Sequence, residues 1–393
     1  MTHSHLSRQY ELLRFASADR SLSCLIASIA MVLSIGSGFY IVIPSVSYFI
    51  VLFAFAVLLS DGGFRAAPFL WFSPERLVGA LLLIIIFLSY SVFFPVDGRQ
   101  FLTVINASIS GIVSYALWSR VIGFVGFDDR QARRPVVYCA LLGLALLLAG
   151  QFAELLGYLD IRGLSSADRE DSFIFRPGGF HNPNMTAAIA LTFFFVVYRV
   201  SHSRGSVLLL LALVLAAAVT LLSQSRAAIG ILVLFGSLIV SKNRKLAITF
   251  FFAAIAFVIV ADDVVVLLLD QAAGRFRGDS SSDDRAQLLV RGIAEIENAP
   301  FFGNGYRHIQ ALTGQSTHNE LIENLVNFGL FGFVAVSLAF GLLYLPASAA
   351  FVFLCIIPSL IFSHNFFDNA SLQIVIGMAL SIERAWSLQA KSR

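Results

Sequence analysis

The residues best suited to chemistry are arginines and one histidine that lie in polar stretches between long apolar runs. The longest polar stretch, residues 270–320, ends in Thr317-His318-Asn319-Glu320. Its arginines are Arg275, Arg277, Arg285, Arg291 and Arg307. Arginine presents a rigid fork of donors that binds phosphate or carboxylate through paired hydrogen bonds. This stretch therefore indicates a loop that binds an anion and carries the chemistry.

His318 lies in a sequence that is typical of a helix start. Thr317 and Glu320 have the spacing of a capping box, which places His318 in the first turn of the next helix. The positive end of a helix disfavours a charged imidazole, so a neutral His318 could act as a general base. The alternative is that Thr317 and Glu320 only cap the helix and His318 has no role.

A polar stripe follows His318 into the apolar run. Asn319, Glu323 and Asn327 recur every four residues, with Glu320 and Asn324 beside them. Such groups are costly inside a membrane unless they line a cavity or pair with other helices. We favour a functional stripe over helix packing, and we predict that Asn319, Glu320 and Glu323 bind substrate.

Two further motifs carry arginine at the edge of an apolar run. In Ser223-Gln224-Ser225-Arg226, the cation stands at a helix start, where it needs an anionic partner. That partner is either an acidic side chain or a ligand phosphate, and the spacing leaves both open. In RPGGFHNPN, residues 176–184, the glycines allow tight turns and Asn184 could cap the next helix. A structural loop does not account for Arg176 or His181.

Inside the long polar stretch, Ser281-Ser282-Asp283 can cap a short helix. Its apolar side would carry Leu288, Leu289, Ile293 and Ile296. Arg285 and Arg291 fall outside that patch, so the helix is expected to lie on a membrane surface. The alternative for these arginines is simple contact with lipid headgroups.

The composition excludes an ordinary soluble domain. Hydrophobic residues make up 58% of the chain and charged residues 13%, and the mean hydropathy is +0.82. The apolar runs predict an all-α, polytopic membrane protein, residues 1–393, with about twelve transmembrane helices. They are expected near 22–38, 40–60, 76–95, 101–125, 135–159, 184–200, 205–222, 226–241, 245–268, 320–342, 344–362 and 370–386. The net charge of +3 does not indicate nucleic acid.

Positive charge sets the expected orientation. With both termini in the cytoplasm, every lysine and most arginines fall on the cytoplasmic side. Two substantial loops, residues 160–183 and 270–319, would then be periplasmic, and arginine supplies all their positive charge. No motif for a metal ion or a cofactor is present in the sequence.

The order of four motifs resembles the bacterial O-antigen ligase and polysaccharide polymerase superfamily. The motifs are RPGGFHNPN, SQSRAAIG, DDRAQLL with ENAPFFGNGY, and STHNELIENLVNFGLFG. The resemblance covers roughly residues 135–385, and the first four runs match only as generic membrane helices.

This resemblance implies a metal-independent, inverting glycosyltransferase of the GT-C type in the bacterial inner membrane. The donor would be a glycan on undecaprenyl diphosphate. The acceptor would be a lipid-linked glycan, which we favour, or lipid A core. By match to the family motifs, Arg226 and Arg285 would hold the diphosphate and His318 would activate the acceptor. Arg176, Asn182 and Asn184 would line the donor site, and we add His181 and Arg291 to the substrate-binding residues.

A transporter or flippase of lipid-linked oligosaccharide is the alternative from another class. It predicts polar residues at mid-membrane positions of many helices. Here the polar residues gather at helix ends and in loops, which favours the enzyme. The expected partners are membrane lipids and, for polysaccharide assembly, a chain-length regulator or flippase, with no nucleic acid.

Overall fold

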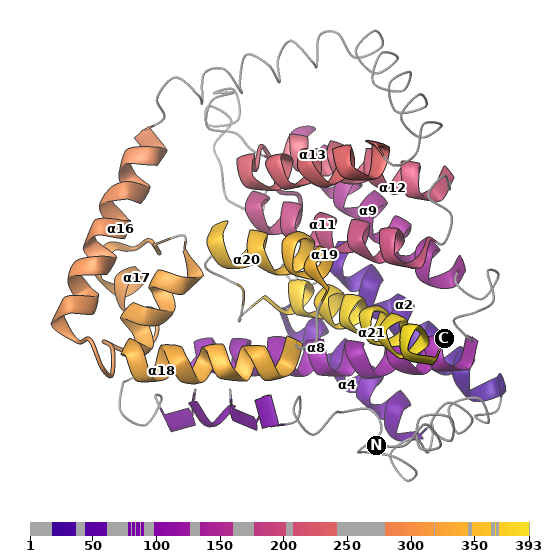
Figure 1. The fold of residues 1–393 in the computed structure, drawn as a ribbon, viewed down its shortest axis with the longest axis horizontal. Coiled ribbons are helices and arrows are strands. Elements are labelled where there is room, and N and C mark those ends of the chain that lie inside the picture. Colours follow the sequence, from indigo (N-terminus) through magenta and orange to yellow (C-terminus); the bar gives the residue numbers. More distant parts are fainter. Residues whose placement is uncertain are drawn as a thin grey trace, which may run out of the picture.

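The computed structural model shows an assembly of helices (Figure 1). It describes residues 18–36, 44–60, 98–125, 134–159, 177–201, 207–241, 280–317, 319–344, 348–362, 366 and 369–392, with parts of 78–89. The first helices are α2 (Ala18–Gly36), α4 (Pro44–Ser60), α8 (Gly98–Val125), α9 (Arg134–Leu155), α11 (Pro183–Val200), α12 (Val207–Leu222) and α13 (Arg226–Ser241). The later ones are α16 (Ser280–Asn298), α17 (His308–Thr313), α18 (Glu320–Tyr344), α19 (Ala349–Phe351), the π-helical turn η1 (Val352–Ile356), α20 (Ile357–Phe362) and α21 (Ala370–Ser392).

The chain is a multi-pass membrane protein. Three of its described helices are long and apolar enough to cross a membrane, namely α9, α11 and residues 320–339 of α18. Shorter apolar helices lie in α2, α4, α12 and α13. The all-α class is confirmed, whereas the count of about twelve spans stays a prediction. The span expected at 245–268 and most of the one at 76–95 lie outside the described residues.

Helix α11 forms the centre of the bundle and packs against α9, α12 and α21. Its three consecutive phenylalanines, Phe193, Phe194 and Phe195, are all fully buried. A Cβ atom at Gly143 of α9 would lie 2.4 Å from the ring of Phe193, so the absent side chain makes room for the ring. Helix α11 is therefore held on several sides, and its first residues are well placed to anchor a site.

Helices α8 and α21 make a second close contact through small residues. A Cβ atom at Gly377 would lie 2.3 Å from the carbonyl oxygen of Gly111. Ser114 Oγ donates to the carbonyl of Ile374 at 2.6 Å. Small residues and a serine hydroxyl are the usual means by which membrane helices approach each other closely.

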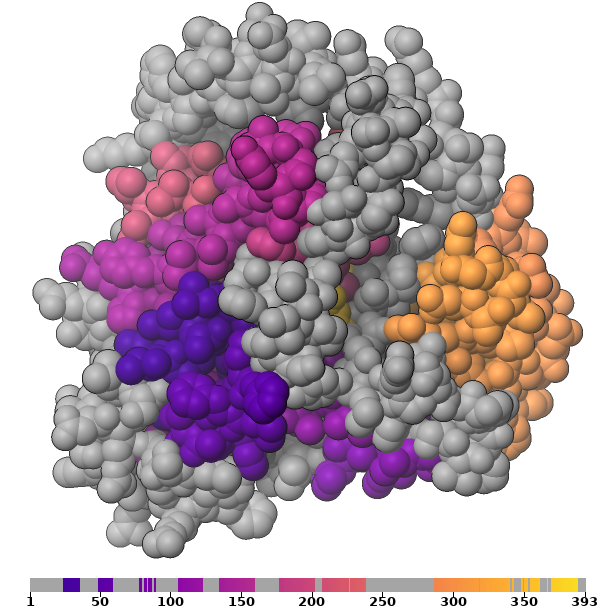
Figure 2. Space-filling view, turned by 180° about the vertical axis from the view of Figure 1, so that it is seen from behind, coloured from indigo at the N-terminus to yellow at the C-terminus, as the bar shows by residue number. Residues whose placement is uncertain are grey.

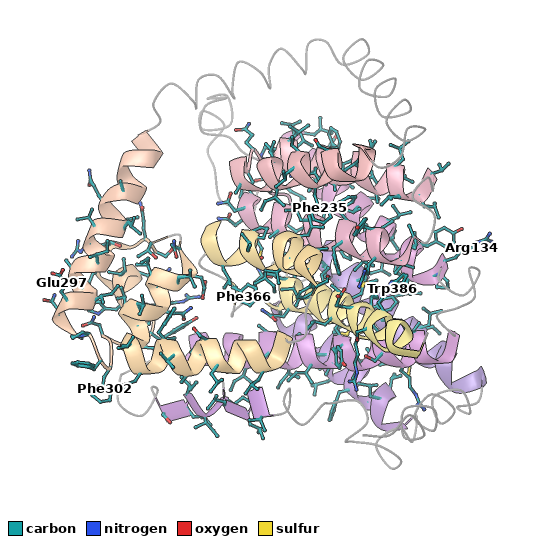
Figure 3. All side chains as sticks on the ribbon, viewed as in Figure 1. Arg134, Phe235, Glu297, Phe302, Phe366 and Trp386 are labelled. Atoms are coloured by element: carbon teal, nitrogen blue, oxygen red, sulfur yellow. The ribbon has the colours of Figure 1, made fainter. Side chains whose placement is uncertain are left out.

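A charged cluster lies at the C-terminal end of α11. Arg199 pairs with Glu383 of α21 at 3.0 Å, and its guanidinium lies 5.0 Å from the centre of the Trp386 ring. Glu383 also accepts from the backbone N–H of Ser348 at 3.1 Å. Figure 3 shows Trp386 on α21, on the far side of the bundle from α16.

Helices α16 and α17 lie to one side of the bundle and pack on α18 (Figure 1). In the view from behind, the same residues form the orange edge of the molecule (Figure 2). Helix α18 reaches the bundle through α20, which also contacts α11 and α13. The helices α11 and α13 on one side and α18 on the other carry predicted site residues, and α20 joins them.

Candidate functional site

The last turns of α9 hold the RPGGFHNPN turn through a buried carboxylate. Glu154 Oε2 accepts from the backbone N–H groups of Gly178 and Gly179, both at 2.7 Å, and the residue is only 3% exposed. Gly179 has a positive φ of 65°, and a Cβ there would lie 2.8 Å from the backbone of Gln151. Any other residue would be strained at this position and would clash with α9.

One glutamine joins this turn to the SQSR motif. Nε2 of the fully buried Gln151 contacts the carbonyl of Pro177 at 3.0 Å, the carbonyl of Val219 at 3.1 Å and Ser223 Oγ at 2.8 Å. Ser223 Oγ donates in turn to Val219 at 2.7 Å, so it accepts from Gln151. Two motifs more than forty residues apart in the sequence therefore meet on one side chain of α9.

The helix start predicted after SQS is confirmed. Ser225 O accepts from the N–H of Ile229 at 2.9 Å, and α13 begins at Arg226. Gln224 has a positive φ of 48°, which turns the chain sharply between α12 and α13. The side chain of Arg226 lies outside the described residues.

The start of α11 differs from the expectation in its cap. Asn182, not Asn184, caps the helix, because Asn182 Oδ1 accepts from the N–H of Asn184 at 3.0 Å. Pro183 then takes the first helical position, which leaves the cap to the residue before it. Asn182 is exposed, and Arg176 lies outside the described residues.

His181 connects this turn to the end of α2. Its Nε2 lies 3.0 Å from the carbonyl oxygen of Ile35. Burial lowers the pKa of His181 to about 4, although the hydrogen bond to Ile35 acts in the opposite direction. The ring is therefore neutral at physiological pH and donates its Nε2 proton to Ile35.

The helix predicted inside the long polar stretch is confirmed as α16, but its apolar side is divided. Leu288 is buried with Ile309 and Val326, whereas Leu289 and Ile293 are 37% and 46% exposed. A Cβ at Gly292 would lie 2.9 Å from Ile322 of α18. The face that meets α18 therefore follows positions 288, 292 and 296, whereas Leu289 and Ile293 point away from it.

The helix α16 contains two predicted site arginines, Arg285 and Arg291, at positions on different sides of the helix. Arg291 is exposed. The backbone of Arg285 belongs to α16, one turn before Leu288, so its position is on the side that meets α18. The side chain of Arg285 lies outside the described residues.

Helix α18 is interrupted at Gly329, a break that the sequence did not predict. Gly329 has φ 63° and ψ −171°, which is not helical. In an uninterrupted helix, the carbonyls of Val326 and Asn327 would accept from Leu330 and Phe331. These four groups instead bond to the segment before α17: Asn304 N to Val326 O at 2.8 Å, Gly305 N to Asn327 O at 3.0 Å, Leu330 N to Pro300 O at 2.8 Å, and Phe331 N to Phe301 O at 3.1 Å.

We call this pairing of residues 300–305 with α18 the backbone clasp. A Cβ at Gly329 would lie 2.4 Å from Phe301, and one at Gly303 would lie 2.5 Å from Asn327. Both glycines have positive φ. Phe301 stacks on Phe331 with ring centres 5.8 Å apart, and Phe302, at the outer edge in Figure 3, remains 68% exposed. The backbone clasp therefore explains two motifs together, FFGNG at residues 301–305 and NFGLF at residues 327–331.

His308 and Glu295 strengthen the same region. His308 Nε2 lies 3.1 Å from Glu295 Oε2, and the backbone N–H of His308 donates to Asn327 Oδ1 at 3.2 Å. Burial alone raises the pKa of Glu295, but the hydrogen bonds from Asn298 and His308, together with the nearby Arg291, outweigh it and leave the pKa below its ordinary value. These contacts fix α16 and α17 against α18.

The start of α18 corrects the predicted capping box. The helix begins at Glu320, and its cap is Asn319, whose Oδ1 accepts from Leu321 at 3.0 Å and Ile322 at 3.2 Å. Thr317 bonds through its N–H and its hydroxyl to Glu323 Oε2, at 3.1 and 2.8 Å, and not to Glu320. The predicted pair is wrong because the helix starts two residues later than a Thr317 cap requires. His318 lies outside the described residues.

The polar stripe of α18 is buried. Its exposed fractions are small for Glu320 (5%), Glu323 (5%), Asn324 (5%) and Asn327 (1%). Glu320 Oε2 accepts from the N–H of Phe366, which lies between α18 and α20 (Figure 3), at 3.4 Å. Glu323 Oε1 and Ser316 Oγ are buried without a hydrogen-bond partner in the part of the chain that the structure describes.

Gln151 and Glu154 are the site residues that the sequence reading missed. Both lie in the final turns of an expected span and are three residues apart, so they share one helix face. An amide and a carboxylate side chain inside an apolar run were the sequence signal that could have identified them. Among the described residues, no cluster of three or more His, Cys, Asp or Glu side chains could hold a metal ion.

The sequence comparisons bear on the second half of this arrangement. Residues 185–337 match the model of a protein family described as O-antigen ligase. The match extends from α11 into α18 and includes positions 226, 285 and 318, whereas α9 and the turn at 177–182 precede it. A search among curated proteins found no match.

Proposed function

Since residues 185–337 belong to the O-antigen ligase domain family, we propose that this chain is an inverting glycosyltransferase that uses a glycan on undecaprenyl diphosphate as donor. The family membership already indicates a ligase- or polymerase-type membrane enzyme of surface polysaccharide synthesis. The observation that best supports the finer proposal is the contact through Gln151. It brings the turn that follows Arg176 to the loop that precedes Arg226.

In the proposed reaction, His318 takes the proton of the acceptor hydroxyl. The acceptor oxygen attacks the anomeric carbon from the side opposite the diphosphate, and the bond from that carbon to the diphosphate oxygen breaks. Undecaprenyl diphosphate leaves with the bonding electrons, and the anomeric configuration inverts. Arg226 and Arg285 hold the leaving diphosphate by charge-assisted hydrogen bonds, so the reaction needs no metal ion.

The remaining predicted residues divide between donor and acceptor. We place the donor near Arg176, His181, Asn182, Asn184 and Arg291. We place the acceptor near Asn319, Glu320 and Glu323. The buried oxygens of Glu323 and Ser316 support a polar ligand at the acceptor position, because buried polar atoms normally have hydrogen-bond partners.

The proposed setting is the bacterial inner membrane, with residues 160–183 and 270–319 on the periplasmic side and both termini in the cytoplasm. We favour a polymerase that joins lipid-linked repeat units over a ligase that transfers to lipid A core. A chain-length regulator or a flippase is the expected protein partner.

The test uses purified protein in nanodiscs with EDTA and an undecaprenyl-diphosphate-linked oligosaccharide from the same cells. A ladder of longer lipid-linked chains, read on a gel, is expected. His318→Ala, Arg226→Ala and Arg285→Ala should each lower the rate about a hundredfold or more. Transfer only after addition of lipid A core would make the protein a ligase.

A matched control is available for the arginines. Arg134→Ala replaces an exposed arginine at the start of α9, and it should leave transfer unchanged. If authentic donor gives no product with either acceptor, yet proteoliposomes move that donor across the bilayer, the protein is a transporter and the proposal is wrong.

A further inference from the structure

The end of α9 carries two buried polar side chains that the proposed reaction does not use. Gln151 is fully buried and Glu154 is 3% exposed. Burial of a carboxylate or an amide costs free energy unless hydrogen bonds replace the lost water. Residues at these positions therefore need specific partners, and the partners show what the side chains do.

The partners that the structure describes belong to two short turns and, for one bond of Gln151, to Val219 in the last turn of α12. Glu154 binds the N–H groups of Gly178 and Gly179, which fixes the turn that follows Arg176. Gln151 binds Pro177 of the same turn and also Ser223, three residues before Arg226. The hydroxyl of Thr186 donates to Gly178 at 2.5 Å, so α11 holds this turn from the other side.

Gln151 bonds to Pro177, directly after Arg176, and to Ser223, three residues before Arg226. Arg226 is the first residue of α13, and the Ser223–Ser225 turn before it is buried at both of its serines. A shift of one turn relative to the other would change the distance between Pro177 and the start of α13.

We propose that Gln151 and Glu154 are positioning residues that hold the turn at 177–179 at a constant separation from the Ser223–Ser225 turn before α13, so that Arg176 and Arg226 bind one diphosphate. This inference rests on the proposed function, in which Arg226 grips the leaving diphosphate. Neither residue touches the substrate. They act by holding the two turns, and an error of about 1 Å in such a contact can cost about a hundredfold in rate.

The experiment measures binding of radiolabelled undecaprenyl diphosphate to the detergent-purified full chain, by scintillation proximity, beside the transfer rate. The variants are Gln151→Met and Glu154→Leu, which keep size and remove the hydrogen bonds. Leu147→Ala is the matched control, because Leu147 is buried one turn earlier on the same helix and contributes no hydrogen bond to either turn. Glu154→Gln is the conservative variant, since its amide oxygen can still accept from the glycines.

Gln151→Met and Glu154→Leu are expected to weaken diphosphate binding about tenfold and to lower kcat, whereas Leu147→Ala lowers only thermal stability. Glu154→Gln should restore most of the affinity. The double variant Gln151→Met with Arg226→Ala should bind no more weakly than Arg226→Ala alone, because residues that act through one another are not additive.

Two other results separate the possible errors. If Arg226→Ala weakens binding but Gln151→Met and Glu154→Leu behave like Leu147→Ala, or if the effects in the double variant multiply, this inference is wrong and the proposed function stands. If Arg226→Ala binds undecaprenyl diphosphate as the parent does, the diphosphate clamp of the proposed function is wrong, and the positioning role falls with it.

Discussion

Two regions of the molecule hold a loop against a helix, and they do so by different means. At the end of α9, the side chains of Gln151 and Glu154 form the hydrogen bonds that join the turn at 177–179 to that helix. In the backbone clasp, residues 300–305 bond to α18 mainly through main-chain groups at the break, with one longer side-chain bond from Asn304 to Val326 at 3.4 Å. The first region depends on two polar side chains in addition to Gly179, whereas the second depends mainly on the absence of side chains at two glycines.

This difference determines which substitutions each region tolerates. A buried acceptor removed from α9 leaves backbone N–H groups without partners, and each such group costs about 1–3 kcal/mol. The clasp keeps its hydrogen bonds through most side-chain changes. It fails where a Cβ atom enters the space between the two backbones, as at Gly303 or Gly329.

The largest effect is expected for Gly329→Ala. The new Cβ would lie 2.4 Å from Phe301 at a φ of 63°, so strain and overlap together should cost about 3–5 kcal/mol. Differential scanning fluorimetry would measure the stability, and hydrogen exchange would show lost protection at residues 304, 305, 330 and 331. Gly230→Ala is the control, because no atom lies within 4 Å of its Cβ position in α13. Equal effects at both glycines would contradict the clasp.

Glu154→Leu tests the other region. Two buried N–H groups, of Gly178 and Gly179, would lose their acceptor, which should destabilise the protein by about 2–4 kcal/mol. Thermal unfolding in detergent gives the measurement, with Glu154→Gln expected to lose less than half as much. A full loss in Glu154→Gln would mean that the charge, and not the hydrogen bonds, is what matters.

His181 makes the first region sensitive to pH. Because its pKa falls to about 4 from the ordinary 6.5, the unfolded chain binds a proton more readily than the folded one. The stabilisation is complete above pH 6.5 and is lost as the pH falls towards 4. Unfolding temperatures followed across this window should decline less in His181→Gln, which cannot titrate. A variant that matched the parent at every pH would show that His181 is not buried in its neutral form.

The smallest effect is expected at Asn319. Replacement by alanine removes the cap of α18 and should cost about 1 kcal/mol, whereas Asn319→Asp should retain the stability. The same fluorimetry measures both variants. A loss as large as that of Gly329→Ala would place the critical contact of this region at the cap and not at the clasp.

The sequence predicted elements better than their contacts. The α-helical class, the helix start at Arg226 and the presence of α16 follow from apolar runs and cap residues, which are local signals, although the predicted cap residues Ser281–Asp283 lie inside α16 and not before it. Asn182 and Asn319, as the true caps, could not be separated from their neighbours, because Asn184 and Thr317 are equally suitable by type. Each observed cap lies two residues from the predicted one, so the hydrogen-bond partners at both helix starts differ from the prediction.

The two contacts that organise the candidate site depend on long-range pairing. Gln151 bonds to residues 26 and 72 positions away, and no local pattern specifies either partner. The break at Gly329 could not be predicted for a similar reason, since glycines in an apolar run are common in membrane helices. Among the described residues, 300–305 supply the partners at this break, and they precede α17.

The backbone clasp also has a consequence for the order of biosynthesis. Peptide groups that enter hydrocarbon without a hydrogen-bond partner cost several kcal/mol each. If α18 entered the bilayer alone with the break at Gly329, four such groups would be left without partners. Residues 300–305 leave the ribosome before α18 does, so their partners already exist when the helix emerges. The helix can reach its final shape only when residues 300–305 lie against it, so that earlier segment must be in place before α18 is complete.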